Sequence, residues 1–337
     1  MNKNTINKII LMLTLIIGLK ESIRAQQSIQ FSQYIFNSLS VNPAYAGYKE
    51  ELFAQLAVRT QWTGIKGAPQ TGQLSLDGVT NTTTKRMGLG LQLTADRLGP
   101  QTATSIYFNY AYRLQLDAAD TKRLSFGLAA GLTSYGLDGS LLDPISPEDQ
   151  SLPNGMINSY IPDVRFGIYY YSSKFYLGAS MLDLLSGDQS NDIFRWNAGT
   201  VQNIKRKRSL YIIAGTLFDL SDGLKLRPSM LVKEDFKGPT SLDLNAMFIF
   251  NDRFWIGGGY RTGITLWNKE YKQGQTLSNS NSLSAIVQFY ANDRLRIGYS
   301  YDYIVSGLST VQNGTHEITL GLTFPSKTNR ILSPRFF

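Results

Sequence analysis

The sequence predicts an all-β protein whose strands form a transmembrane antiparallel β-barrel. Three observations carry this prediction. The chain of 337 residues is rich in glycine (30), tyrosine (19) and phenylalanine (17) and has only 17% charged residues, a composition that favours strands over helices. Long stretches alternate between apolar and polar residues, and a leader for export precedes them.

The N-terminus has the features of a secretory signal peptide. Lys3 and Lys8 precede an apolar run from Ile9 to Leu19 that is too short to span a bilayer as a helix. Ala25 then offers a small residue for cleavage, so residues 1–25 are predicted to be removed. No later stretch has the length and apolar character of a transmembrane helix, so residence in a membrane would require a barrel.

The predicted order after cleavage is an N-terminal plug or periplasmic segment (residues 26–50), the barrel (51–324) and a C-terminal tail (325–337). The first of these contains a stretch that fits neither a helix nor a strand, because aromatic and amide side chains mix and a proline stops any regular element. An aromatic segment of this kind predicts docking in or under the lumen, whereas the alternative is an ordinary surface arm. The candidate plug or partner-binding residues are Phe31, Gln33, Tyr34, Phe36, Asn37, Asn42, Pro43, Tyr45 and Gly47.

Alternation of apolar and polar residues runs through the predicted barrel, for example over residues 87–95, 106–114, 124–132, 297–305 and 318–324. These runs are about nine to twelve residues long, which matches a tilted membrane-crossing strand. A soluble sandwich also alternates, but large aromatic faces opposite small polar ones favour a wall between lipid and lumen. Aromatic residues at predicted strand ends suggest interfacial belts: Trp62, Tyr135, Tyr169 to Tyr171, Trp255, Tyr260 and Tyr290.

The predicted strands number fifteen, although a bacterial single-chain barrel has an even number. They begin near residues 51, 69, 86, 101, 122, 160, 174, 193, 208, 224, 240, 253, 281, 294 and 315. One segment must therefore be split, merged or outside the wall, and the strand near 69 and those between 208 and 250 have the weakest pattern. Short turns are predicted at 172–173, 251–253 and 292–294, and long polar loops at 138–159, 183–192, 267–281 and 306–314.

The chemistry of the side chains argues against an enzyme or a cofactor protein. The chain has no cysteine, and its one histidine, His316, is followed by Glu317 on a strand, where neighbours point to opposite faces. No metal-ligand spacing is present. Gly88 and Gly90, and likewise Gly257 to Gly259, lie inside predicted strands. We therefore expect these glycines to relieve curvature or to make room in the lumen, and not to bind phosphate.

The net charge gives no sign of nucleic-acid binding. The formal charge is +8, and removal of the leader, which carries a surplus of three positive charges, leaves about +5. The densest basic run, Lys205–Arg208, is interpreted as a hairpin turn rather than a nucleic-acid patch.

Several motifs resemble one family. Phe31–Asn37 together with Asn42–Gly47 is similar to the N-terminal signature of the PorP/SprF outer-membrane proteins of the Bacteroidetes type IX secretion and gliding machinery. Further matches are Arg59–Trp62 with Gly67–Pro69, Gly298–Tyr303 and Thr315–Ile318. The tail after the last strand also resembles the family, although it departs from simple barrels.

The resemblance implies an outer-membrane barrel of about fourteen strands that binds no cofactor. Its implied partners are the C-terminal domain of a surface adhesin or filament protein secreted by the type IX system, periplasmic lipoproteins of the secretion ring, and outer-membrane lipid. We therefore expect a non-enzymatic anchor of a secreted surface protein, in gliding or attachment. A passive porin is the alternative, and an outer-membrane hydrolase is the weakest hypothesis. Inward charges at Arg59, Arg113, Asp243, Arg296 and Asp302 fit either an anchor or a porin.

Overall fold

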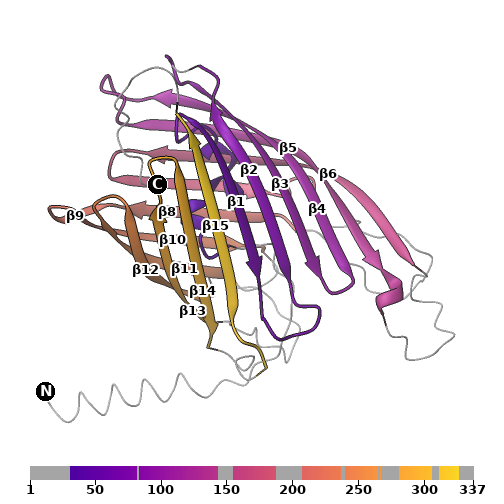
Figure 1. Cartoon of the computed structure of the whole chain (residues 1–337). Helices are drawn as coiled ribbons and strands as arrows, with labels where there is room; N and C mark the ends of the chain where they lie inside the picture. Colours follow the sequence, from indigo (N-terminus) through magenta and orange to yellow (C-terminus); the bar gives the residue numbers. More distant parts are fainter. Residues whose placement is uncertain are drawn as a thin grey trace, which may run out of the picture.

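The computed structural model describes residues 31–81, 83–142, 155–186, 207–236, 240–264, 266, 281–305 and 311–325. The predicted signal peptide, the strand near residue 193, most of the tail and the first two residues of the basic run lie outside these ranges. The described elements are antiparallel strands and a few 3-10 turns (Figure 1). No helix among the described residues is long and apolar enough to cross a membrane.

Three 3-10 turns precede the first strand and a fourth follows the fifth strand. The turns are η1 (Tyr34–Phe36), η2 (Ser38–Ser40), η3 (Pro43–Tyr45) and η4 (Gly139–Leu141). The strands are β1 (Leu52–Thr60), β2 (Gln70–Val79), β3 (Met87–Leu98), β4 (Gln101–Gln115), β5 (Arg123–Asp138), β6 (Met156–Tyr171), β7 (Phe175–Leu182), β8 (Ser209–Thr216), β9 (Phe218–Ser221), β10 (Leu224–Glu234), β11 (Thr240–Phe250), β12 (Phe254–Ile264), β13 (Ser282–Tyr290), β14 (Leu295–Ile304) and β15 (Thr315–Phe324).

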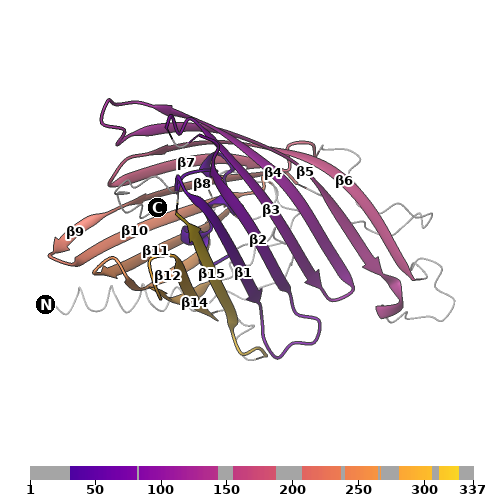
Figure 2. The ribbon, with the colours of Figure 1, turned by 45° about the horizontal axis from the view of Figure 1, so that its top comes forward.

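The sheet closes on itself. Consecutive strands pair along the chain, except that β8 pairs with β10 and not with β9. β15 pairs with β1 and β10 pairs with β11, so the described strands form a ring (Figure 2). The short β9 is not a separate wall strand, because it and β8 both pair with β10, at opposite ends. The fifteen strands therefore make a fourteen-strand wall, which confirms the predicted barrel and its strand number. The strands with the weakest sequence pattern, near 69 and between 208 and 250, are all present.

Alternation along each strand separates an apolar outer surface from a polar interior. On β4 the side chain of Phe108 is 63% exposed, whereas its neighbours Tyr107 and Asn109 are 1% and 3% exposed. The same alternation recurs in β1, β2 and β15. Because exposed leucines and aromatics ring the outside, lipid is the medium that this surface fits.

The two ends of the barrel differ. Short turns at 172–174, 222–223, 251–253 and 291–294 lie at one end, together with the start of β1 and the end of β15. We call this the short-turn end and the opposite one the long-loop end. Outer-membrane barrels place short turns in the periplasm and long loops outside the cell, so the long-loop end faces outward.

Three details differ from the sequence-based predictions. The strands range from 8 residues in β7 to 16 in β5 and β6, excluding the short β9. The loop predicted over 138–159 is shorter, because β5 includes Asp138 and β6 already begins at Met156. The belt prediction was also wrong for Tyr169, Tyr171 and Trp255, which are buried on the inner face, whereas Tyr260 is exposed.

Candidate functional site: a segment inside the lumen

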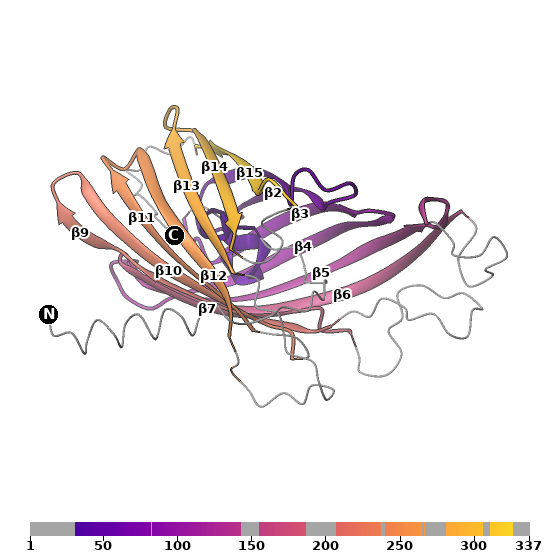
Figure 3. The same ribbon diagram turned by 90° about the horizontal axis from the view of Figure 1, so that it is seen from below.

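Residues 31–50, which we call the lumen segment, lie within the ring of strands (Figure 3). Every residue of the segment is buried except Ser40 and Lys49. The chain folds here as three successive 3-10 turns and not as a helix, because Pro43 cannot continue a helix. Asn42 is extended and its side chain caps the third turn by accepting from the amide of Ala44 at 2.9 Å.

Buried charges hold the start of the lumen segment near the long-loop end. The carboxylate of Glu317 accepts the backbone N–H groups of Ser32 at 2.8 Å and Gln33 at 3.0 Å. Arg59 donates to Glu317 at 2.8 Å and to Asp302 at 2.8 Å. We call these five residues the outer charge cluster. Both carboxylates are buried, and each of them pairs with Arg59.

Side chains from β2, β12 and β14 hold the middle of the segment. Arg296 donates to the carbonyl of Phe36 at 3.2 Å, and Gln73 donates to the side chain of Asn37 at 3.0 Å. The ring of Phe36 meets Trp255 edge to face at 5.4 Å. Trp255 thus lines the interior and packs on the segment, which accounts for its absence from the outer surface.

Asn42 ties the segment to the wall formed by β6 and β7. Its amide donates to the carbonyl of Ile168 at 3.0 Å, while its own oxygen caps the next turn. The hydroxyl of Ser180 donates to the carbonyl of Val41. The bonds to the N–H of Ala44 and the carbonyl of Val41 satisfy backbone groups that the short turns leave unpaired inside the barrel.

Two glycines allow the backbone of the segment to touch the wall. A Cβ atom on Gly88 would lie 2.0 Å from the carbonyl oxygen of Ala46, and one on Gly127 would lie 2.1 Å from the nitrogen of Ala44. Any side chain at these positions would collide with the segment. The prediction that Gly88 makes room in the lumen is therefore confirmed, because the backbone of the segment occupies that space. At Gly257 the added atom would instead meet the neighbouring strand, at 2.0 Å from the carbonyl oxygen of Ala246.

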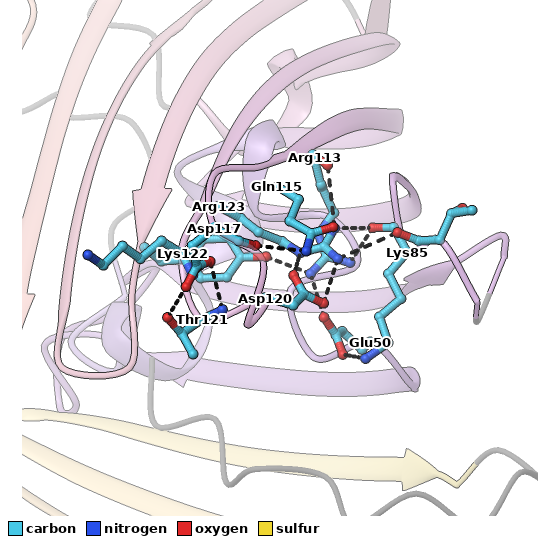
Figure 4. Close-up of polar contacts among 11 residues, drawn as sticks. Glu50, Lys85, Arg113, Gln115, Asp117, Asp120, Thr121, Lys122 and Arg123 are labelled. Carbon is cyan, nitrogen blue, oxygen red and sulfur yellow. Dashed lines mark hydrogen bonds and ion pairs between the residues drawn. The ribbon is translucent and has the colours of Figure 1, made fainter.

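A second group of charges holds the end of the segment at the short-turn end (Figure 4). The buried carboxylate of Glu50 pairs with Lys85 and, at 3.2 Å, with Arg113. Arg123 donates to the carbonyl of Lys85 at 2.8 Å and pairs with Asp120 at 2.6 Å. We call these five residues the inner charge cluster. It joins the end of the lumen segment to the β2–β3 and β4–β5 turns.

The β4–β5 turn beside this cluster is organised by one carboxylate. Asp117 accepts from the hydroxyl of Thr121 and from the backbone N–H of Lys122 at 2.8 Å (Figure 4). The hydrogen bond from Thr121 is the main reason why the pKa of Asp117 lies below its ordinary value. The turn therefore keeps its conformation while Asp117 is ionised.

The nine residues singled out from the sequence all lie in the lumen segment and are all buried: Phe31, Gln33, Tyr34, Phe36, Asn37, Asn42, Pro43, Tyr45 and Gly47. Their role as plug or partner-binding groups stays a prediction. Tyr45 stacks on Tyr48 at 4.9 Å, and the amide of Gly47 donates to Asp77 at 2.8 Å.

The sequence did not identify the wall residues that hold the segment, such as Glu317, Asp77 and Trp255. The sequence feature that could have identified these residues is an isolated charged or aromatic residue at an inward strand position. Arg59 and Arg296 were predicted to be inward charges on this basis.

His316 and Glu317 point to opposite faces, as predicted from strand alternation. Glu317 is buried in the lumen, whereas His316 lies on the outer face with its Nδ1 atom 2.7 Å from the hydroxyl of Tyr299. Within the described ranges, no group of three or more His, Cys, Asp or Glu residues could hold a metal ion.

The closed antiparallel ring, with an apolar outer surface and a polar interior, defines an outer-membrane β-barrel. The chain belongs to the type IX secretion system membrane protein PorP/SprF family, whose model matches residues 23–322. It is therefore an outer-membrane component of type IX secretion, as the resemblance of its motifs implied. No curated protein sequence matches the chain significantly.

Solved structures share the fold at low sequence identity. The chain is similar to the CymD monoaromatic hydrocarbon channel, with a TM-score of 0.52, 14% identity and coverage of 91% of this chain and 96% of that one. The Ralstonia pickettii toluene transporter TbuX gives a TM-score of 0.51 at 11% identity, covering 86% of this chain and 93% of that one. These likenesses concern the barrel architecture alone.

Proposed function

We propose that this protein is a non-enzymatic anchor of the outer membrane that binds the C-terminal domain of a surface protein secreted by the type IX system. In this role it retains an adhesin or filament protein for attachment or gliding. Membership of the PorP/SprF family supports the link to secretion. The secreted partner contacts the long-loop end, and periplasmic lipoproteins of the secretion ring contact the short-turn end.

The observation that carries this proposal is the fixed lumen segment. At one end the buried Glu317, which is paired with Arg59, accepts two backbone N–H groups of the segment, and at the other end Glu50 of the segment pairs with Arg113. Removing one partner from a buried pair costs about 3–5 kcal/mol. Release of the segment would break the ion pairs of Glu50 and would remove two N–H donors from the buried Glu317, which favours a barrel that stays closed over one that conducts passively.

The alternative of a passive porin requires a continuous aqueous path. Planar-bilayer recording separates the two functions, because a plugged anchor is silent whereas a porin conducts steadily. A hydrolase is disfavoured by the position of His316. This histidine, the one in the sequence, faces outward beside Tyr299, away from the polar interior.

Deletion of residues 31–47 tests the role of the lumen segment. We expect the shortened protein to reach the outer membrane as a heat-modifiable barrel and to lose its secreted partner from the cell surface. The measurement is the amount of type IX cargo that remains with intact cells and co-purifies with the detergent-solubilised barrel. Full retention of cargo by a correctly assembled deletion variant would contradict the role given to the segment.

A further inference from the structure

The outer face of the wall carries an isolated positive charge. In the described strands, every arginine and lysine but one occupies an inward position: Arg59, Arg113, Arg123, Arg165, Lys225, Arg227, Lys233, Arg261 and Arg296. The exception is Arg97 near the end of β3, which is exposed and lies on the same outward face as Leu89 and Leu93. A charge on this face destabilises a barrel in the middle of the membrane and is tolerated near the interface. The level of Arg97 in the membrane therefore decides what it can bind.

Arg97 lies at the edge of the apolar band, at the long-loop end. On the neighbouring β4, the outward side chains from Leu114 to Ile106 are all aliphatic or aromatic. They cover about 27 Å of strand, or about 20 Å across the membrane at a tilt of about 40°. The next two outward side chains are Thr104 and Thr102, and Thr102 pairs directly with Arg97. The guanidinium group is thus at the level of the lipid headgroups.

Polar side chains flank Arg97 on the same face. It pairs with Gln70 of β2 and Thr102 of β4, so the three side chains lie next to one another on adjacent strands (Figure 1). Thr102 in turn pairs with Gly136, where an added Cβ atom would lie 2.5 Å from the Thr102 hydroxyl and 3.1 Å from the side-chain oxygen of Asn158. The bare backbone of Gly136 therefore lets these two polar groups converge. We call Gln70, Arg97, Thr102 and Asn158 the boundary row.

The positive charge of the boundary row is not neutralised by the protein. Among the described residues, the guanidinium group of Arg97 has no hydrogen-bond or ion-pair partner. The adjacent carboxylate of Asp96 lies on the inner face and accepts from the hydroxyl of Thr71. Asp138, at the end of β5, accepts from the backbone N–H and the hydroxyl of Ser140. An anion from outside the chain can therefore pair with Arg97.

We infer that the boundary row binds the phosphate group of a membrane lipid in the leaflet at the long-loop end. The planar guanidinium group of Arg97 can donate two parallel hydrogen bonds to phosphate oxygens, and the amide of Gln70 and the hydroxyl of Thr102 add donors beside it. The row continues directly into the outward leucines Leu74 and Leu93, which the acyl chains of the same lipid would cover. This continuity favours a lipid over a soluble anion. The inference is independent of the proposed anchor function, because it concerns the outer face of the wall.

A pair of lipids that differ only in the phosphate group tests the inference. The full-length barrel, stripped of lipid in detergent, is titrated with dioleoyl phosphatidic acid or with dioleoylglycerol, and bound lipid is counted by native mass spectrometry. We expect the phosphate-bearing lipid to bind at least tenfold more tightly. Inorganic phosphate at the same concentration should not displace it, because the acyl chains contribute to binding.

Variants of two exposed arginines on opposite sides of the membrane locate the site. Arg97→Gln removes the charge from the boundary row and is expected to weaken binding of phosphatidic acid at least tenfold, without affecting dioleoylglycerol. Arg97→Lys keeps the charge but loses the planar fork, so its affinity should fall between those of Arg97→Gln and the wild type. The matched control is Arg86→Gln, just before β3 at the short-turn end, which should bind within about twofold of the wild type. Heat modifiability monitors assembly of each barrel.

Three results would overturn the inference. Equal binding of the two lipids would mean that the phosphate group is not recognised. Equal weakening by Arg97→Gln and Arg86→Gln would mean that phosphatidic acid responds to the total charge of the barrel and not to the boundary row. Displacement of the lipid by an equal concentration of inorganic phosphate would identify a site for a soluble anion.

Discussion

The contact between Gly127 and the lumen segment gives a direct test of closure. The perturbation is Gly127→Ala, which adds one carbon to the inner face of β5. That carbon would lie 2.1 Å from the nitrogen of Ala44 and 2.4 Å from the carbonyl carbon of Pro43. Since ordinary contacts of this kind begin near 3.4 Å, the segment must move by about 1 Å or leave the wall.

The cost follows from the contacts near this point. Movement of the segment disturbs the bond from Asn42 to the carbonyl of Ile168 and the bond from Ser180 to the carbonyl of Val41. Each contributes about 1 kcal/mol, and overpacking adds about 1–3 kcal/mol. Docking of the segment should therefore weaken by roughly 3–5 kcal/mol, which corresponds to roughly 10²-fold to 4 × 10³-fold more of the undocked state.

Planar-bilayer recording is the assay. The wild-type barrel is expected to be silent, and Gly127→Ala is expected to show openings. The matched control is Gly72→Ala, a glycine of β2 where an added carbon meets nothing within 4 Å. The control introduces the same chemical change in a wall strand and should remain silent.

One result would refute the reasoning. If Gly127→Ala assembles normally, stays silent and keeps its lumen segment as resistant to protease as in the wild type, closure does not depend on this fit. If the control also opens, the effect comes from the wall and not from the segment.

Three further predictions use the polar contacts of the same segment. Glu317→Gln leaves Arg59 with one carboxylate partner fewer, so the free energy of unfolding of the barrel should fall by about 3 kcal/mol or more. Heat modifiability should then show unfolding at a lower temperature. An unchanged transition would show that the pair is not needed. Asp77→Asn keeps an acceptor for the amide of Gly47 and should be nearly neutral, whereas Asp77→Ala should cost about 1–3 kcal/mol in the same assay; equal effects would mean that this bond contributes nothing. His316→Ala should leave cargo retention at the cell surface unchanged, and loss of retention would return a role to the histidine.

Alternation predicted the wall because it is a local property. The inward side of β4 can be assigned from Tyr107 and Asn109 without knowledge of any other strand. The short turns at 251–253 and 292–294 follow equally from local sequence. The start of β6 was placed too late, near 160, because residues 156–159 do not carry the strong aromatic alternation that follows them.

The partners of the lumen segment could not be predicted, because they depend on register over long separations. Glu317 binds the amide of Gln33 across 284 positions of the sequence, and which inward carboxylate meets the segment is decided only when the ring closes. Trp255 was assigned to an interfacial belt for a different, local reason. Its alternation places it on the inner face, but its position near a strand end suggested the membrane interface.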